Sequence, residues 1–164
     1  MRQEQGFSLI ELLIVVAIIL IIAAIAIPNL VRARVAANEA SASASVRQLA
    51  TAEISYNSAY PSTGYSTLAT LGGAAPCTAS ALTGCFIDNV LALGSKSGYQ
   101  FEAVGFGGPP NTTFVAGAVP QNFNVSGVRD FCVVTDGVLR INPGGAGAPL
   151  PPDVAACQAY ASAQ

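Results

Sequence analysis

The chain has no histidine, and its charged side chains make up only 10% of 164 residues. Without histidine it lacks the side chain that enzymes use most often as a general base and that proteins use most often as a metal ligand. The net charge of −2 provides no basic excess that would attract nucleic acid. These shortages argue against a catalytic, metal-binding or nucleic-acid-binding protein, and we expect no cofactor.

Sequence patterns of known catalytic sites are also missing. The glycines at 107–108 and within 144–147 are not followed by the Gly-Lys-Ser/Thr of a phosphate-binding loop. Lys96 stands between two serines, but this adjacency is not the signature of an activated nucleophile. Asp130 and Asp136 flank a predicted strand, and two carboxylates are too few for a calcium site. We therefore expect no catalytic residues and no bound metal.

One long apolar run lies near the N-terminus. Sixteen consecutive apolar residues extend from Leu12 to Ile27. From Phe7 onward only Ser8 and Glu11 interrupt the pattern, so a helix starting at Phe7 would be roughly 30 Å long, which matches the hydrocarbon core of a bilayer. A carboxylate inside such a span costs about 2.5–3.5 kcal/mol on insertion scales, which makes Glu11 a candidate functional residue.

Three interpretations of this run compete. An ordinary secretory signal peptide would have an apolar stretch of about 7–15 residues, and the A-x-A-like site in "AIAIP" is followed at once by Pro28. A plain membrane anchor explains the length of the run but not Glu11. The third interpretation is a short leader that is cut between Gly6 and Phe7, leaving a hydrophobic helix that begins at Phe7.

The third interpretation agrees with a family pattern. The stretch "GFSLIELLIVVAIILIIAAIAIPNL" resembles the N-terminus of type IV pilins and pseudopilins, in which a leader ends in glycine, an aromatic residue follows, and glutamate comes four residues later. This chain has Gly6, Phe7 and Glu11 at those positions, and Pro28 near the end of the run. The resemblance implies cleavage after Gly6 by a prepilin peptidase, N-methylation of Phe7, and pairing of Glu11 with a neighbouring subunit's terminal amine.

The chemistry of Glu11 supports such a pairing. After cleavage Phe7 carries a new ammonium group, and a cation and a carboxylate in a low dielectric attract each other strongly enough to offset part of the cost of burying either. A buried polar residue among apolar helices can fix their register. The alternative is that Glu11 lies at the membrane surface and interacts with the helix dipole. For Pro28 we expect either a kink or a locally unwound helix.

Helical character continues beyond the apolar run. The segment 29–60 has no glycine or proline and much alanine, so we expect the helix to end near Tyr60, before Pro61. Arg32 and Arg34 are expected to mark the membrane surface, to pair with Glu39, or to lie on a solvated face with some subunit contact. A weakly apolar stripe would lie against a sheet. Its members are Ala42, Val46, Leu49 and Glu53, with Ile54 beside the last.

The remaining chain indicates short strands. Alternation over 99–104 and β-rich composition over 112–119 predict two strands, and the segment 128–141 predicts a hairpin with a type I′ turn at Asp136-Gly137. The segment 60–73 is expected to be a loop with a short helical turn. The phrases "KSGYQF" and "RDFCVVTDGVLR" also resemble strands of a subgroup of bacterial major pilins. The predicted fold class is α+β: a long N-terminal helix, its first half membrane-spanning, packed on an antiparallel sheet of three or four strands.

Four cysteines are present, and none forms a C-x-x-C pair, so a zinc site is not expected. An even number of cysteines behind an export segment indicates two disulfide bonds in an oxidising compartment. Three pairings are possible. We favour Cys77 with Cys85 and Cys132 with Cys157, because both bonds close local loops, and each should add roughly 2–4 kcal/mol by restricting the unfolded chain. The resemblance also implies a cysteine-closed C-terminal loop.

These observations predict a chain in four parts. Residues 1–6 are a leader, 7–28 a transmembrane and filament-core helix, 29–60 its amphipathic continuation, and 61–164 an exported α+β head with a disulfide-closed C-terminal loop. The resemblance implies a structural type IV pilus subunit, not an enzyme, that is held in the inner membrane and then assembled into an extracellular pilus. Its partners would be its own copies, a prepilin peptidase, the assembly machinery in the inner membrane and, before assembly, the membrane. The alternative is a pseudopilin of a type II secretion system.

Overall fold

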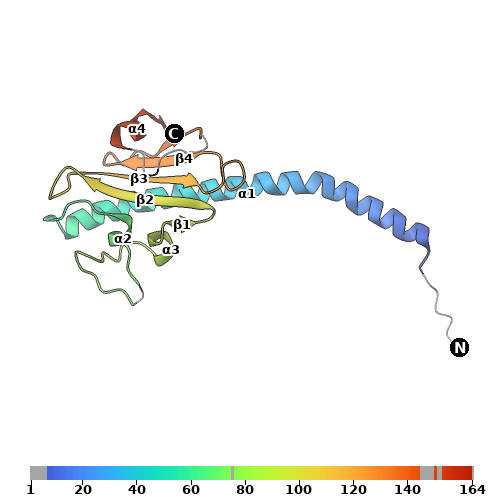
Figure 1. The fold of residues 1–164 in the computed structure, drawn as a ribbon, viewed down its shortest axis with the longest axis horizontal. Coiled ribbons are helices and arrows are strands. Elements are labelled where there is room, and N and C mark those ends of the chain that lie inside the picture. The colour runs from blue at the N-terminus through green and yellow to red at the C-terminus, as the bar shows by residue number, and fades with distance from the viewer. Residues whose placement is uncertain (1–6, 75, 145–149, 151–152, 164) are drawn as a thin grey trace. The chain divides into compact units, whose positions relative to one another are not determined.

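The computed structural model describes residues 7–74, 76–144, 150 and 153–163. It divides into two compact units, Met1–Arg34 and Val35–Gln164, which we call the N-terminal and C-terminal units. Helix α1, Leu9–Ala59, contributes to both units (Figure 1). Its end at Ala59 confirms the prediction that the helix stops just before Pro61. Pro28 lies inside the helix, so the chain remains helical at this position.

The sheet in the C-terminal unit has six strands, where three or four were expected. They are β1 (Ser95–Lys96), β2 (Tyr99–Phe106), β3 (Thr113–Pro120), β4 (Asp130–Val134), β5 (Arg140–Asn142) and β6 (Ala161–Ser162). The spatial order follows the chain order, and every neighbouring pair is antiparallel. The four predicted strands correspond to β2–β5. Strands β1 and β6 are two residues each, too short for a periodic pattern to reveal.

The predicted hairpin is present, but its turn differs from the prediction. The last paired residues of β4 and β5 are Cys132 and Arg140, so the connection is longer than a two-residue type I′ turn. The Asp136 carboxylate accepts the N–H of Val138 at 2.9 Å and pairs with Arg140. Gly137 has φ +72°, which a residue without Cβ adopts freely. These local bonds of Asp136 stabilise the wider loop.

The core lies between one face of the sheet and the second part of α1. The predicted stripe is confirmed, because Ala42, Val46, Leu49 and Glu53 are all buried, whereas Ile54 is 49% exposed and lies outside it. Alternation along β2 sends every second side chain inward. The sheet contributes Tyr99, Phe101, Ala103, Phe114, Ala116, Ala118, Phe131 and Val133 to this core.

Three short helices complete the C-terminal unit: α2 (Leu68–Leu71), α3 (Asn89–Ala92) and α4 (Val154–Ala159). Helix α2 is the helical turn predicted within 60–73. The side chain of Asp88 caps α3, and that of Asp153 caps α4. Helices α2 and α3 lie toward the β1 edge, whereas α4 packs on β3 and β4 (Figure 1).

Candidate assembly segment and its supporting unit

The candidate site begins where the predicted leader ends. Gly6 lies outside the described residues. Phe7 precedes α1 and is 82% exposed, and Glu11 lies in the first turn of the helix. The N–H groups of Glu11 and Leu12 both donate to the Ser8 carbonyl, at 3.1 and 3.3 Å. Within the described part of the chain the Glu11 carboxylate makes no ion pair or hydrogen bond, so its charge is available to a group outside the subunit.

The apolar side chains of the N-terminal unit are uncovered. Every large apolar side chain from Phe7 to Val31 is exposed, from 45% at Val16 to 82% at Phe7. By length and composition, α1 is long and apolar enough to cross a membrane. An apolar surface of this extent marks a membrane or protein contact. The segment therefore has two possible environments, lipid or the helices of other subunits.

This segment matches known proteins. The family model described as the prokaryotic N-terminal methylation motif matches residues 1–27. Over 39 residues the chain is 64% identical to the "Type IV wide pilus major component PilA4" of Thermus thermophilus. The aligned stretch covers 24% of this chain and 30% of that protein. Over 54 residues it is 46% identical to the "Type IV major pilin protein PilA" of Myxococcus xanthus, covering 33% of this chain and 24% of the relative. The N-terminal segment of the chain is therefore similar to that of type IV pilins.

The likeness is limited in extent. The matched stretch spans less than a third of the length of either relative. No solved structure matches the chain. The C-terminal unit is therefore described from its own residues, and three features hold it together or set it apart: an ion pair, two buried acids and two disulfide bonds.

The ion pair joins α1 to the sheet. Glu39, 6% exposed, accepts the N–H groups of Val128 and Arg129 at 2.9 and 3.1 Å, and it pairs with the Arg129 guanidinium at 2.6 Å. Burial alone would raise the pKa of the Glu39 carboxyl, but the bonds from Val128 and Arg129 outweigh it and lower the pKa. Arg129, and not Arg32 or Arg34, is the observed partner of Glu39, so this one of the alternatives given for the two arginines is wrong.

Two other acids are buried with no cation beside them among the described residues. Glu53 has no exposed surface; one of its oxygens accepts the N–H of Ser66 at 3.0 Å, and the other has no hydrogen-bond partner in the described part of the chain. Burial raises its pKa to about 7. Asp130 is 2% exposed, accepts from the Asn142 amide at 3.1 Å, and has a pKa raised by burial to about 6. Both carboxyls are thus held in surroundings that favour the protonated form.

These acids do not form a metal site. Asp130 faces Asn142, whereas Asp136 pairs with Arg140 in the hairpin loop. The Arg140 hydrogen bond is the main cause that lowers the pKa of Asp136. Within the described residues no three His, Cys, Asp or Glu side chains are close enough to hold a metal ion.

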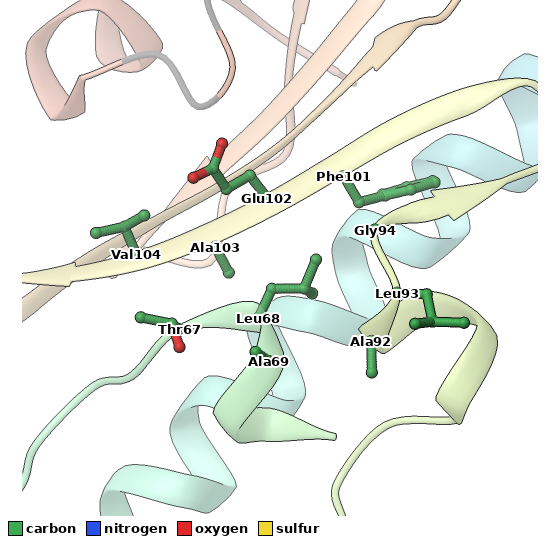
Figure 2. A pocket seen from close by; sticks show the side chains of 10 residues that line it. All are labelled: Thr67, Leu68, Ala69, Ala92, Leu93, Gly94, Phe101, Glu102, Ala103 and Val104. Carbon is green, nitrogen blue, oxygen red and sulfur yellow. The ribbon is translucent and has the colours of Figure 1, made fainter. Parts of the chain in front are cut away.

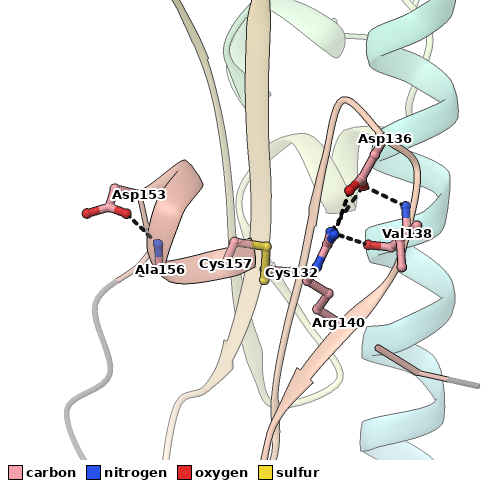
Figure 3. Close-up of a disulfide and its surroundings, with 7 residues drawn as sticks. All are labelled: Cys132, Asp136, Val138, Arg140, Asp153, Ala156 and Cys157. Carbon is pink, nitrogen blue, oxygen red and sulfur yellow. Dashed lines mark hydrogen bonds and ion pairs between the residues drawn. A yellow bond between two sulfur atoms is a disulfide. The ribbon is translucent and has the colours of Figure 1, made fainter. Parts of the chain in front are cut away.

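The four cysteines form the two disulfide bonds that were favoured among the three possible pairings. Cys77 is bonded to Cys85, and Cys132 to Cys157. Figure 3 shows the second bond joining α4 to β4. It belongs to a second apolar cluster on the outer face of the sheet, which also includes Val115 and Val134. This disulfide therefore holds a separate layer of the unit in place.

One apolar hollow of about 300 Å³ lies between β2 and the α2–α3 region (Figure 2). Leu68, Phe101 and Ala103 are among its lining residues. Glu102 and Val104 point to the opposite side of β2 from Ala103 (Figure 2). The hollow brings no acid, base or nucleophile together in a catalytic arrangement.

Local sequence reasoning missed the roles of Glu39, Glu53 and Asp130. Glu39 and Glu53 occupy the buried face of an amphipathic helix. An acid on such a face is a sequence signal of a buried polar role. The Arg129 partner is 90 residues away along the chain. No local pattern identifies a partner at that separation.

Proposed function

We propose that the chain is a structural subunit of a type IV pilus, made as a membrane-anchored precursor and polymerised through its N-terminal helix. The observation that carries this proposal is an apolar helix surface left uncovered from Phe7 to Val31 and interrupted by the single acid Glu11. The methylation motif over residues 1–27 supports it, as do two relatives named as pilus components.

The first step is processing. A prepilin peptidase cuts between Gly6 and Phe7, removes the leader 1–6 and methylates the new N-terminus. Phe7 precedes the first residue of α1, so the new amine lies at the start of the helix. The cleavage leaves an ammonium group that the precursor does not have at this position.

The second step is assembly. In the membrane the helix 7–28 is covered by lipid, and in the filament by other helices, so transfer gains little from dehydration and depends on packing and polar pairing. Glu11 of one subunit pairs with the Phe7 ammonium of the next. This pairing occurs in a low dielectric, where an unpaired carboxylate is costly. It therefore favours the one register in which Glu11 meets an amine. Pro28, which lacks an N–H, weakens the helix locally and helps it adapt to its new neighbours.

The third part is the coat. The segment 29–60 continues the helix, and residues 61–164 form the head that lies on the outside of the filament. Two disulfides suit an extracellular position. The subunit thus resides in the inner membrane first and in the pilus on the cell surface afterwards. Its partners are other copies, the peptidase and the inner-membrane assembly machinery, and its role is structural.

A pseudopilin of a type II secretion system is the alternative, and it is not favoured. Both relatives are named as type IV pilus proteins. A calcium requirement of the folded C-terminal unit would favour the pseudopilin, but its described acids do not converge on a metal site.

Mass spectrometry of sheared surface filaments tests the proposal. We expect a chain that begins at N-methylated Phe7, with a mass four hydrogens below the fully reduced form. An intact Met1, or an N-terminus created by cleavage after Ala26, would overturn the processing step. Absence of the chain from filaments would overturn the proposed function.

A further inference from the structure

A groove of about 270 Å³ runs along α1 in the C-terminal unit. Its α1 wall includes Ala36, Ala40 and Ser43, which are spaced three or four residues apart and so lie on one side of the helix. Such small residues let a second chain approach the helix closely. The opposite wall comes from the sheet and the C-terminal segment, and includes Leu139 and Ile141.

Arg47 gives this groove an unbalanced charge. It lines the groove and is exposed, and its side chain makes no ion pair or hydrogen bond with any residue that the structure describes. The other cations of the unit are each paired: Arg129 with Glu39, Arg140 with Asp136, and Lys96 with Asp88 at 4.0 Å. The lining also includes the Glu39–Arg129 ion pair, whose charges cancel. The groove therefore offers small and apolar side chains beside one guanidinium that is unpaired among the described residues, which suits an apolar side chain with an acid nearby.

Exposed apolar side chains with an acid nearby are found at α3. Val90 is 55% exposed and Leu93 76% exposed, and a spacing of three residues puts both on one side of the short helix. Asp88, just before α3, has a side chain that is 47% exposed. Its carboxylate is 4.0 Å from the Lys96 ammonium, the outer limit of an ion pair, so a second cation can approach it. We call Asp88, Val90 and Leu93 the α3 corner.

The groove and the α3 corner lie at opposite edges of the sheet. Helix α3 packs on β1, the first strand in the sheet order. The groove is lined by residues of β4 and β5 and by Ala163, which follows β6 at the other edge. Surfaces so placed do not meet within one subunit. A contact between two different patches of identical subunits repeats without self-pairing, which is the requirement for an open filament.

We propose that, within the pilus, the α3 corner of one copy docks in the α1 groove of a neighbouring copy. Leu93 enters the groove beside Ala40 and Ile141, and the Asp88 carboxylate faces Arg47. This inference rests on the proposed function and specifies which surfaces of the C-terminal unit hold neighbouring copies in register.

Paired cysteine substitutions test the contact in filaments. The chain has no free cysteine, so Ser43→Cys in the groove and Val90→Cys at the α3 corner introduce the only reactive thiols. Under mild oxidation of filaments that carry both substitutions, we expect a ladder of covalent dimers and higher multimers on a non-reducing gel. Each substitution alone should give monomer with at most one dimer band.

Gln48→Cys combined with Val90→Cys is the matched control. Gln48 is exposed and follows Arg47, but one residue along a helix turns the side chain about 100° away from the groove. This pair should give no ladder. Filaments that form normally but yield no Ser43–Val90 ladder, or the same ladder with Gln48, would overturn the contact and leave the pilus proposal intact. If the unsubstituted chain forms no filaments, both proposals fail.

A charge reversal gives a second measurement without new thiols. Arg47→Glu should lower the yield of sheared filaments by roughly fivefold or more, because it places two carboxylates face to face. Arg47→Lys keeps the charge and should stay near the unsubstituted yield. Since the Arg47 side chain makes no bond within the described subunit, neither change should affect its folding. An unchanged yield with Arg47→Glu would overturn the contact with Asp88.

Discussion

The two units of this chain treat apolar surface in opposite ways. In the N-terminal unit every large apolar side chain from Phe7 to Val31 is exposed, whereas the C-terminal unit buries most of its large apolar side chains, the majority of them in one core that includes α1 and the sheet. The second unit also has two disulfides and an ion pair from helix to sheet. The difference teaches that the C-terminal unit contains its own apolar core, whereas the apolar side chains of the N-terminal unit need a lipid or protein environment outside the subunit.

The strongest test of this contrast is Glu11→Ala. We expect the number of surface filaments seen by electron microscopy to fall to near zero, because the amine of Phe7 loses its carboxylate partner. The precursor should still accumulate in the membrane, since Glu11 belongs to the N-terminal unit and the core of the C-terminal unit is built from other residues. Glu11→Asp, which keeps the charge, is the control and should retain part of the assembly. Normal filaments from Glu11→Ala would refute the pairing.

The next test removes disulfides from the C-terminal unit. A bond that closes a separation of 25 residues should contribute about 3.5 kcal/mol and one that closes 8 residues about 2.5 kcal/mol. Replacing Cys132 and Cys157 by alanine should therefore cost more stability in urea unfolding than replacing Cys77 and Cys85. The Cys132–Cys157 bond also anchors α4 over the second apolar cluster, which should increase the difference in stability between the two double variants. Equal costs, or a larger cost for the shorter loop, would contradict this ranking.

The last pair of tests concerns the buried acids, whose effect depends on pH. Because burial raises the pKa of Glu53 from 4.5 to about 7, the folded state holds a proton that the unfolded state releases. The free energy of unfolding should therefore fall as the pH rises from about 4.5 to about 7. Glu53→Gln removes this loss, because glutamine does not titrate. The difference in unfolding free energy between the variant and the unsubstituted chain should therefore shift in favour of the variant by up to about 3 kcal/mol from pH 4 to pH 8.

Glu39→Gln provides the control with the opposite sign. The pKa of Glu39 is lowered, so its stabilising effect is present above its unfolded pKa and is lost as the pH falls through the lower folded value. Glu39→Gln should thus destabilise the unit at neutral pH. Urea unfolding at pH 4 and pH 8 measures both variants, and parallel pH dependence of the two would contradict the assignment.

The predictable part of the molecule was the part governed by local spacing. The apolar run, the helix end before Pro61, the stripe from Ala42 to Glu53 and the alternation in β2 each follow from periodicity within a few residues. The two-residue strands β1 and β6 carry too few positions for any period. The turn at Asp136 differs from the type I′ prediction, because its side chain bonds to Val138 and Arg140 and so stabilises a wider loop than the Asp-Gly pair alone favours.

The candidate site divides in the same way. Glu11 is conspicuous in sequence because an acid in an apolar run is rare. The pairing of Glu39 with Arg129 depends on the complete fold, since it joins residues on α1 and before β4 that chain order alone does not bring together. The groove containing Arg47 likewise exists only where α1 and the sheet edge meet.

The bonds of Glu39 also have a mechanical consequence. Along α1, Glu39 is the first residue that is buried against the rest of the C-terminal unit. When a filament is stretched, a pull that reaches the helix from its N-terminal side meets the carboxylate before it meets the apolar core. The Glu39 carboxylate makes four hydrogen bonds or ion-pair contacts to Val128 and Arg129. These contacts would bear part of the load and reduce the force on the packed side chains behind them. In the proposed filament, resistance to stretching would thus depend on Glu39 as well as on the apolar core.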